Sequence, residues 1–407
     1  MGGANFLENL LDGAEVEWKP LGELGTLIRG SGLQKKDFTE KGVPAIHYGQ
    51  IYTYYGLSTT ITKSFVSPEL AKQLRKVDKG DVVITNTSEN LEDVGKALLY
   101  LGEHQAVTGG HATIFKPGGC ILGKYFAYFT QLAEFANEKR KYAKGTKVID
   151  VSATDMAKIL IPIPCPDNPQ KSLAIQSEIV RILDTFSELT AELTAELTAE
   201  LTARQKQYNY YRDRLLRFEG AEVEWKTLGE VADNLDSMRK PITSSQRDPG
   251  DIPYYGASGV VDYVKDYIFD GDFLLVSEDG ANLLARNTSI AFSIRGKSWV
   301  NNHAHVLKFK TYTERRYVEY YLNSIDLTPY ISGAAQPKLN KKSLESISIP
   351  APSLEDQARI VAILDKFDAL TNSISEGLPR EIELRQKQYA YYRDMLFNFP
   401  KSKKAAG

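Results

Sequence analysis

A four-residue unit, Glu-Leu-Thr-Ala, is repeated four times in succession between residues 188 and 203. The run contains no glycine or proline, and Ala, Glu and Leu favour helices, so it predicts the middle of one helix from near Ser172 to near Phe218. At about 1.5 Å per residue such a helix is about 70 Å long, which is more than the core of one globular domain requires. The repeat therefore predicts a spacer rather than a catalytic element.

An apolar stripe gives this helix one side that needs a partner. From Ile179 onward, apolar residues recur three and four positions apart, which is typical of a coiled-coil-like seam. Two stretches of the helix return 181 residues later, because Ile179–Phe186 is matched by residues 360–367 and Arg204–Asp213 by residues 385–394. We expect two long helices of equal length between these landmarks.

A second repeat divides the chain into two similar halves. Gly13–Glu23 returns almost unchanged as Gly220–Glu230, at an offset of 207. Since the offsets of 207 and 181 differ by 26, the second variable body is shorter by 26 residues. Both bodies mix strand-like apolar runs with glycine-rich turns, which predicts an α+β class for each. Weak echoes such as His111-Ala-Thr and His303-Ala-His suggest one fold with two surfaces.

The composition indicates a folded protein of two or more domains. The chain has 407 residues, 42% of them hydrophobic, and no polar low-complexity tract. Its two cysteines form no CxxC motif or disulfide framework, which favours a reducing cytoplasm. No apolar run approaches the roughly 18 residues of a membrane span, and the first residues lack the pattern of a signal peptide. A net charge of −2 does not by itself indicate binding to nucleic acid.

Motifs of common enzymes are absent from the sequence. There is no phosphate-binding loop, no dinucleotide-binding glycine loop and no His-Glu-x-x-His motif. Asp167–Gln170 faintly resembles the Asn-Pro-Pro-aromatic motif of adenine methyltransferases, but it lacks the second proline and the aromatic residue. The five histidines have no metal-ligand spacing, so we expect no metal site.

The repeated helices, together with the exits Ile161-Pro-Ile-Pro and Ile347-Ser-Ile-Pro, resemble the DNA-specificity subunit of type I restriction-modification systems. The chain is most similar to the subgroup with Thr-Ala-Glu-Leu spacer repeats. The resemblance implies two target-recognition domains, each reading one half of a bipartite asymmetric DNA site, joined by two antiparallel helices in a pseudo-twofold repeat. The helix pair would set the length of the spacer between the half-sites.

The resemblance also implies that the chain is not an enzyme. It would direct two methyltransferase subunits and the restriction subunits to double-stranded DNA in the cytoplasm. It would carry no cofactor of its own, whereas S-adenosylmethionine, ATP and Mg would belong to the partner subunits. The expected organisation is a first recognition domain (1–164), a central helix (165–219), a second recognition domain (220–350), a C-terminal helix (351–400) and a tail (401–407).

Direct readout of base edges needs amides, guanidinium groups and hydroxyls on loops. In the first body the candidate DNA-binding residues are Lys35, Lys36, His47, Gln50, Tyr52, Asn86, Ser88, Asn90 and His111. In the second body they are Arg239, Lys240, Arg247, Tyr254, Tyr255, Ser258, Ser277, Glu278, Asn282, Arg286, Asn301, Asn302, His303, Gln336, Lys338 and Asn340. The last three lie in a loop that recurs in recognition domains of this family.

Two other interpretations remain open from the sequence alone. The repeated domains could form a scaffold that binds peptides, or the chain could modify DNA itself. Any single candidate residue could also be an ordinary solvated loop residue. The tyrosines of the two helix motifs are expected to pack between helices or against partner subunits rather than to stack on bases.

Overall fold

The computed structural model describes residues 3–218, 223–333, 336–373 and 376–400. The chain divides into two compact units. Unit 1 consists of residues 1–194 and 384–407, and unit 2 consists of residues 195–383. Each unit therefore contains one variable body together with helical segments from both halves of the sequence.

Unit 1 is an α+β domain built on two main sheets. A five-stranded sheet has the order β2-β11-β7-β9-β4, and a four-stranded sheet has the order β5-β3-β10-β6. The short pairs β1-β13 and β12-β8 complete it. Its strands are β1 (Val16–Pro20), β2 (Gly25–Arg29), β3 (Val43–Ile46), β4 (Ser58–Thr59), β5 (Ser64–Val66), β6 (Arg75–Val77), β7 (Val82–Thr85), β8 (Thr87–Ser88), β9 (Ala97–Tyr100), β10 (Ala106–Thr108), β11 (Ala112–Pro117), β12 (Ile149–Asp150) and β13 (Leu160–Pro164).

The helices of unit 1 pack on both faces of the five-stranded sheet and on the four-stranded sheet. They are α1 (Gly3–Leu11), α2 (Leu21–Leu24), α3 (Tyr48–Thr53), α4 (Pro68–Gln73), α5 (Gly123–Phe129), α6 (Ala133–Tyr142), α7 (Ala153–Met156) and the first part of α8 (Pro169–Leu215). Five consecutive residues of α5 are buried, and they share one core with Ile179 of α8 and with Phe397 and Phe399 near the C-terminus. The end of the chain is therefore part of the first domain.

Unit 2 is built on one six-stranded sheet with the order β15-β20-β18-β19-β16-β17. The strands β14 and β21 form a separate two-stranded sheet. Its strands are β14 (Glu224–Thr227), β15 (Asp233–Asn234), β16 (Pro249–Gly256), β17 (Gly259–Val264), β18 (Phe269–Ser277), β19 (Ala291–Val300), β20 (Ala304–Lys308) and β21 (Ser348–Ala351). Its helices are α9 (Leu228–Val231), α10 (Asn282–Ala285), α11 (Tyr312–Ser324), α12 (Lys341–Glu345) and α13 (Leu354–Thr371). The two-domain α+β class predicted from the sequence is confirmed.

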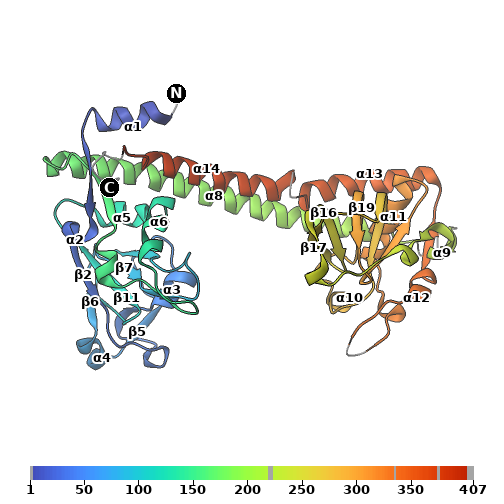
Figure 1. Cartoon of the computed structure of the whole chain (residues 1–407), viewed down its shortest axis with the longest axis horizontal. Coiled ribbons are helices and arrows are strands. Elements are labelled where there is room, and N and C mark those ends of the chain that lie inside the picture. Colours follow the sequence, from blue (N-terminus) through green and yellow to red (C-terminus); the bar gives the residue numbers. More distant parts are fainter. Residues whose placement is uncertain (1–2, 219–222, 334–335, 374–375, 401–407) are drawn as a thin grey trace. The chain divides into compact units, whose positions relative to one another are not determined.

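The tetrapeptide repeat lies within α8, which is one helix of 47 residues (Figure 1). It starts at Pro169, and proline is well suited to the first helical position because that residue has no intrahelical donor to lose. No glycine or proline follows until the helix ends at Leu215. The predicted helix is therefore present, within three residues of the expected limits at each end.

The second long helix is interrupted, which differs from the single helix predicted over 351–400. Here α13 ends at Thr371 and α14 begins at Gly377 and runs to Leu396. Gly377 has a φ of +79°, and a Cβ at this position would lie 2.3 Å from the carbonyl oxygen of Ala369. A left-handed glycine of this kind does not continue a helix, so the helix stops and restarts.

The matched motifs of the two helical segments contact each other reciprocally. In unit 1 the ring of Phe186 on α8 lies 5.5 Å from that of Tyr392 on α14. In unit 2 the ring of Tyr211 on α8 lies 5.6 Å from that of Phe367 on α13. The offset of 181 converts Phe186 into Phe367 and Tyr211 into Tyr392, so the two contacts are copies of one another. The same two aromatic positions of the repeated motifs therefore meet in each unit.

Each body also holds its long helix by the same kind of polar contact. In unit 1, Asp184 of α8 accepts hydrogen bonds from Tyr128 and from Lys124, both at 2.7 Å. In unit 2, Asp365 of α13 accepts from Tyr320 at 2.6 Å and from Arg316 at 3.0 Å. A tyrosine and a basic residue one helical turn earlier therefore bind the aspartate of each Ile-Leu-Asp motif.

Candidate nucleic-acid interface

A cleft of about 770 Å³ opens on the surface of unit 1. Its walls come largely from α3, from the residues that follow β7, from the residue before β11 and from the residue before β12. Most of the residues predicted for the first body line this cleft, namely Lys35, His47, Gln50, Tyr52, Ser88, Asn90 and His111. The structure thus brings together side chains that are up to 76 positions apart, from Lys35 to His111.

Tyr48 also lines the cleft, although it was not among the predicted residues. Its ring lies 4.6 Å from that of His47, 4.8 Å from that of His111 and 6.0 Å from that of Tyr52. The four rings therefore form one aromatic cluster at the N-terminal end of α3. The sequence contained one signal that could have identified Tyr48 as a lining residue, namely its position between two predicted residues, His47 and Gln50.

Two polar side chains in this cleft, His47 and Gln50, differ in how their hydrogen-bonding atoms are engaged. Burial, together with the charges of Lys35 and His111, lowers the pKa of His47 below its ordinary value and so favours the neutral ring. Its Nδ1 already accepts a hydrogen bond from the backbone of Gly49. The amide nitrogen of Gln50 donates to Ser64, while its Oε1 is buried and has no hydrogen-bond partner among the described residues. Buried carbonyl oxygens are normally hydrogen-bonded, so this atom stands out among the groups of the cleft.

Two predicted residues of the first body lie elsewhere. Lys36 is exposed outside the cleft. Asn86 is fully buried, where its amide nitrogen donates to the carbonyl oxygen of Val151 and its Oδ1 accepts from Thr113. The prediction of a DNA contact for Asn86 is corrected to a structural role, because both ends of its amide are bonded inside the domain.

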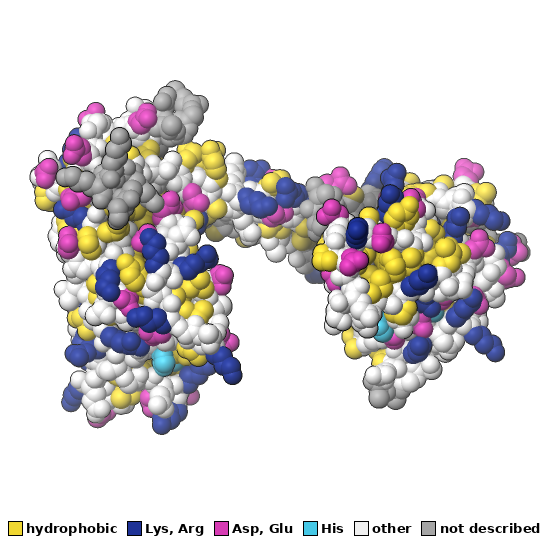
Figure 2. All heavy atoms as spheres, viewed as in Figure 1, with side chains coloured by type: hydrophobic (Ala, Val, Ile, Leu, Met, Phe, Trp, Pro, Cys, Tyr) yellow, Lys and Arg dark blue, Asp and Glu magenta, His cyan; other side chains and the backbone are white. Residues whose placement is uncertain are grey.

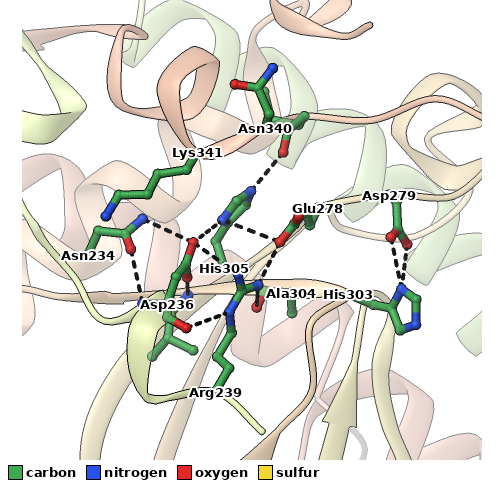
Figure 3. Close-up of polar contacts among 12 residues, drawn as sticks. Asn234, Asp236, Arg239, Glu278, Asp279, His303, Ala304, His305, Asn340 and Lys341 are labelled. Atoms are coloured by element: carbon green, nitrogen blue, oxygen red, sulfur yellow. Dashed lines mark hydrogen bonds and ion pairs between the residues drawn. The ribbon is translucent and has the colours of Figure 1, made fainter. Parts of the chain in front are cut away.

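In unit 2, several predicted residues gather where β18 ends (Figure 3). The backbone nitrogen of Glu278, just after β18, donates to the carbonyl oxygen of His303 at 2.9 Å. The carbonyl oxygen of Glu278 accepts from Leu339 at 2.8 Å. These two bonds join the end of β18, the turn before β20 and the segment before α12 into one surface.

A buried ion-pair network lies beneath this surface (Figure 3). His305 is 0% exposed, with Nδ1 2.6 Å from Asp236 and Nε2 2.7 Å from the carbonyl oxygen of Leu339. Both partners are acceptors, so both ring nitrogens donate. Arg239 donates to Glu278 at 2.6 Å and lies 3.3 Å from Asp236.

This network also bears on metal binding. Asp236, Glu278 and His305 have the composition and closeness of a metal site. However, their ligand atoms are already bonded to one another and to the guanidinium of Arg239, which supplies the positive charge that a metal ion would bring. Burial opposes ionisation of Asp236 and Glu278, but the bonds to His305 and Arg239 outweigh it and lower the pKa of both carboxyl groups. We therefore assign the cluster as a structural support for the surface above it.

Several predicted residues of unit 2 have polar groups that are engaged inside the domain, and for the buried ones the predicted DNA contact is corrected to a structural role. Ser277, for example, is fully buried and donates to the carbonyl oxygen of Ala257. Arg286 donates to the carbonyl oxygens of Leu322 and Ile325, at the C-terminal end of α11. The residues whose polar groups are engaged inside the domain in this way are Arg239, Arg247, Tyr254, Ser277, Glu278, Asn282, Arg286, Asn301 and Asn340.

The remaining predicted residues of unit 2 are accessible. Tyr255 is half-buried against Phe292. The exposed residues are Lys240, Ser258, Asn302, His303, Gln336 and Lys338. Of these, Lys338 lies 3.1 Å from the carboxylate of Glu278, and His303 lies 2.8 Å from that of Asp279.

The surfaces of the two units share one backbone arrangement, which we call the shared frame. It consists of residues 86–87 with His111 in unit 1 and of residues 278–279 with His303 in unit 2. His111 in unit 1 lies 2.9 Å from the hydroxyl of Thr87, and His303 in unit 2 lies 2.8 Å from Asp279. An offset of 192 relates both members of these pairs. The backbone bond from Asn86 to His111 has the same length, 2.9 Å, as that from Glu278 to His303. The echo between His111-Ala-Thr and His303-Ala-His therefore marks equivalent positions that carry different neighbours.

The charge on the visible faces is mixed. Figure 2 shows Lys and Arg side chains interspersed with Asp and Glu on each unit, and a histidine at the surface of each. This agrees with the net charge of −2. None of the described helices has both the length and the apolar character that crossing a bilayer requires.

Comparisons with known proteins identify the family. The model of the type I restriction modification DNA specificity domain matches residues 14–203 and again residues 221–384. The chain is 36% identical over 420 residues to the EcoR124I/EcoR124II specificity subunit of Escherichia coli, covering 98% of both chains. It is 37% identical over 391 residues to the EcoprrI specificity subunit of the same organism, covering 91% of this chain and 92% of the relative.

Solved structures agree at the level of the fold. A chain from a structure of the type I R-M system matches with a TM-score of 0.63 and 18% identity, covering 94% of this chain and 97% of that chain. The HsdS subunit from Thermoanaerobacter tengcongensis matches with a TM-score of 0.52 and 18% identity, covering 94% of this chain and 96% of that chain. Two matches to the specificity domain and two relatives aligned over nearly their whole length lead to one conclusion: the chain belongs to the family of type I restriction-modification DNA specificity subunits.

Proposed function

We propose that this chain recognises a bipartite, asymmetric DNA sequence, with each unit reading one half of the site. The observation that carries this is the shared frame of the two surfaces, in which His111 with Thr87 and His303 with Asp279 occupy equivalent places. The side chains around this frame differ between the units, as two different half-sites require. The chain itself is not catalytic and directs partner subunits to the site.

The relatives are named specificity subunits of type I restriction enzymes, which supports an assembly with other subunits. We propose two methyltransferase subunits and restriction subunits as the partners, in the cytoplasm. S-adenosylmethionine, ATP and Mg would be bound by those partners and not by this chain. A mixed surface charge fits a reader whose partners contribute much of the phosphate neutralisation.

The number of tetrapeptide units would set the spacing of the half-sites, as in the subgroup with Thr-Ala-Glu-Leu repeats. Four residues of helix advance by about 6 Å and turn by roughly 400°, which is a net rotation of about 40°. One base pair advances by about 3.4 Å and turns by roughly 34°. One tetrapeptide therefore changes the reach by on the order of a base pair while nearly preserving the face of the helix.

The test is to sequence the methylated sites in a host that carries the complete system. The expected result is one motif with two specified segments separated by unspecified bases. Deleting Thr194–Leu197 should shorten that spacer by about one base pair and leave both segments unchanged. Glu196→Ala is the matched control, because it alters the same exposed helical region without changing its length. An unchanged spacer after the deletion would contradict the role of the repeat, and a motif with one segment would contradict the two-reader proposal.

A further inference from the structure

In each unit one pair of residues exchanges two backbone hydrogen bonds beside the candidate surface. We call the segments that these pairs enclose the hairpins, 144–150 in unit 1 and 332–338 in unit 2, of which 334–335 lie outside the described residues. In unit 1 the backbones of Lys144 and Asp150 exchange two hydrogen bonds, of 3.0 and 2.8 Å. In unit 2 Ser332 and Lys338 do the same, with bonds of 2.9 and 2.8 Å. The two residues of the second pair each follow their counterparts in the first pair by 188 positions. The sequence did not reveal the hairpin in unit 1, since its residues differ from those in unit 2 at nearly every position.

The glycine that opens each hairpin confirms the equivalence. Gly145 has a φ of +98° and Gly333 a φ of +84°, a conformation that favours glycine. A Cβ on Gly145 would lie 2.1 Å from the carbonyl oxygen of Val148, and one on Gly333 would lie 2.4 Å from that of Gln336. The same clash, three residues along in both cases, makes Val148 and Gln336 counterparts.

Both hairpins are tied to the shared frame. Asp150 pairs with Thr87 through the strands β12 and β8, and Lys338 pairs with Asp279 through an isolated bridge. Thr87 and Asp279 are the residues that contact the paired histidines. Backbone bonds therefore hold each hairpin next to the candidate surface. Val148 and Gln336 lie two residues before the paired residues Asp150 and Lys338, so their positions are fixed whichever side chain they carry.

The side chains at this position differ in chemistry and are accessible. Val148 is 58% exposed and lines the cleft of unit 1. Gln336 is exposed at the surface of unit 2. A single exposed valine is ordinary on a protein surface, so its exposure alone indicates nothing. Val148 differs from other exposed apolar residues in its backbone position, because the equivalent position in unit 2 is occupied by the amide side chain of Gln336.

We propose that Val148 and Gln336 are specificity-determining residues of their respective half-sites. Val148 has no hydrogen-bonding side-chain group, and the apolar feature that a base edge offers in the major groove is the C5 methyl of thymine. Gln336 carries an amide that matches N6 and N7 of adenine. Val148 therefore favours a thymine in the first half-site, and Gln336 favours an adenine in the second. This inference rests on the proposed function of the two surfaces.

The test compares methylated sites in hosts carrying the full system with wild-type, Val148→Gln or Gln336→Ala subunits. Val148→Gln should lower the preference for thymine at one position of the first segment by on the order of tenfold or more, and leave the second segment unchanged. Gln336→Ala should relax one adenine of the second segment only. Ile61→Gln is the matched control, because Ile61 is 75% exposed in the same unit but does not line the cleft.

The outcomes separate this inference from the proposed function. If both variants methylate the wild-type motif with the wild-type preference, the inference is overturned while two-part recognition stands. If the wild-type system itself yields no motif with two segments, the proposed function fails first. Should Val148→Gln abolish methylation, Val148→Ala decides, since it removes the apolar contact without adding a polar group: a relaxed position in the first segment supports the inference, and an unchanged one overturns it.

Discussion

The contact by which unit 2 holds its long helix can be tested by replacing Asp365 with alanine. The carboxylate of Asp365 accepts hydrogen bonds from Tyr312 at 2.7 Å, from Tyr320 at 2.6 Å and from Arg316 at 3.0 Å. Burial opposes the charge on Arg316, but the surrounding carboxylates, with Glu319 foremost, raise its pKa above the ordinary value. The substitution therefore removes a charged acceptor from the hydroxyl of Tyr320 and the guanidinium of Arg316, which are largely buried, and from the exposed Tyr312.

The size of the effect follows from these contacts. A hydrogen bond to a charged group contributes about 1.5–3 kcal/mol, and the 28% exposure of Asp365 reduces that figure. Arg316 keeps its ion pairs with Glu319 and Asp368, at 2.7 and 2.8 Å. We expect a loss of about 2–4 kcal/mol in the free energy of unfolding of unit 2. The counterpart Asp184→Ala, which loses two partners at 31% exposure, should cost unit 1 about 1–2 kcal/mol.

Amide hydrogen exchange on the full chain measures both effects separately. Asp365→Ala should reduce the protection of α11 and α13 and leave α5 unchanged, whereas Asp184→Ala should reduce the protection of α5 and the first turns of α8. Asp365→Asn, which keeps the shape and one acceptor oxygen, should lie between wild type and Asp365→Ala. Equal losses for the two alanine variants, or undiminished protection of α11 in Asp365→Ala, would refute the reasoning.

Three further expectations follow from the structure. The folded-state pKa values of Asp236 and Glu278 lie below their unfolded values, so the stability that these carboxylates contribute is present near neutral pH and is lost as the pH falls; the urea midpoint of unit 2 should decline from about pH 5 downward. Gly145→Ala should destabilise unit 1 by about 1–2 kcal/mol, measured by denaturation, because its φ is positive; Gly119→Ala, with open space and an ordinary φ, should have little effect. Ending the chain after Leu396 removes two buried phenylalanines and should lower the hydrogen-exchange protection of unit 1 only.

The sequence predicted the features that depend on periodicity. The long helix α8 follows from an uninterrupted run of good helix formers, and its limits were within three residues of those predicted. The two α+β bodies followed from strand-like runs that alternate with glycine-rich turns. The interruption between Thr371 and Gly377 was missed because the matched motifs on either side suggested equal helices. The local signals were present, since Gly377 is followed two residues later by Pro379.

The candidate surface was harder to predict because it depends on the direction of single side chains. The sequence predicts that polar residues just after a buried strand are exposed, and Ser88 and Asn90 do line the cleft. Asn86 and Ser277 instead turn inward, where backbone groups at the end of a strand need partners. The hairpin at Gly145 could not be recognised either, because its equivalence to the one at Gly333 is expressed in backbone hydrogen bonds and hardly at all in residue identity.

The two ends of each domain are therefore under different physical constraints. At the helix end, a tyrosine and a basic residue must meet the aspartate of the Ile-Leu-Asp motif, as Tyr128 meets Asp184 and Tyr320 meets Asp365. At the candidate surface, the shared frame is fixed by backbone bonds that place no demand on side-chain type. A different variable body can therefore replace either of the two present ones without disturbing the long helices. It must only carry a helix, in the place of α5 or α11, with the tyrosine and, four positions before it, the basic residue. Side chains at the surface frame remain free to change, which is how one fold can present two different reading surfaces in a single chain.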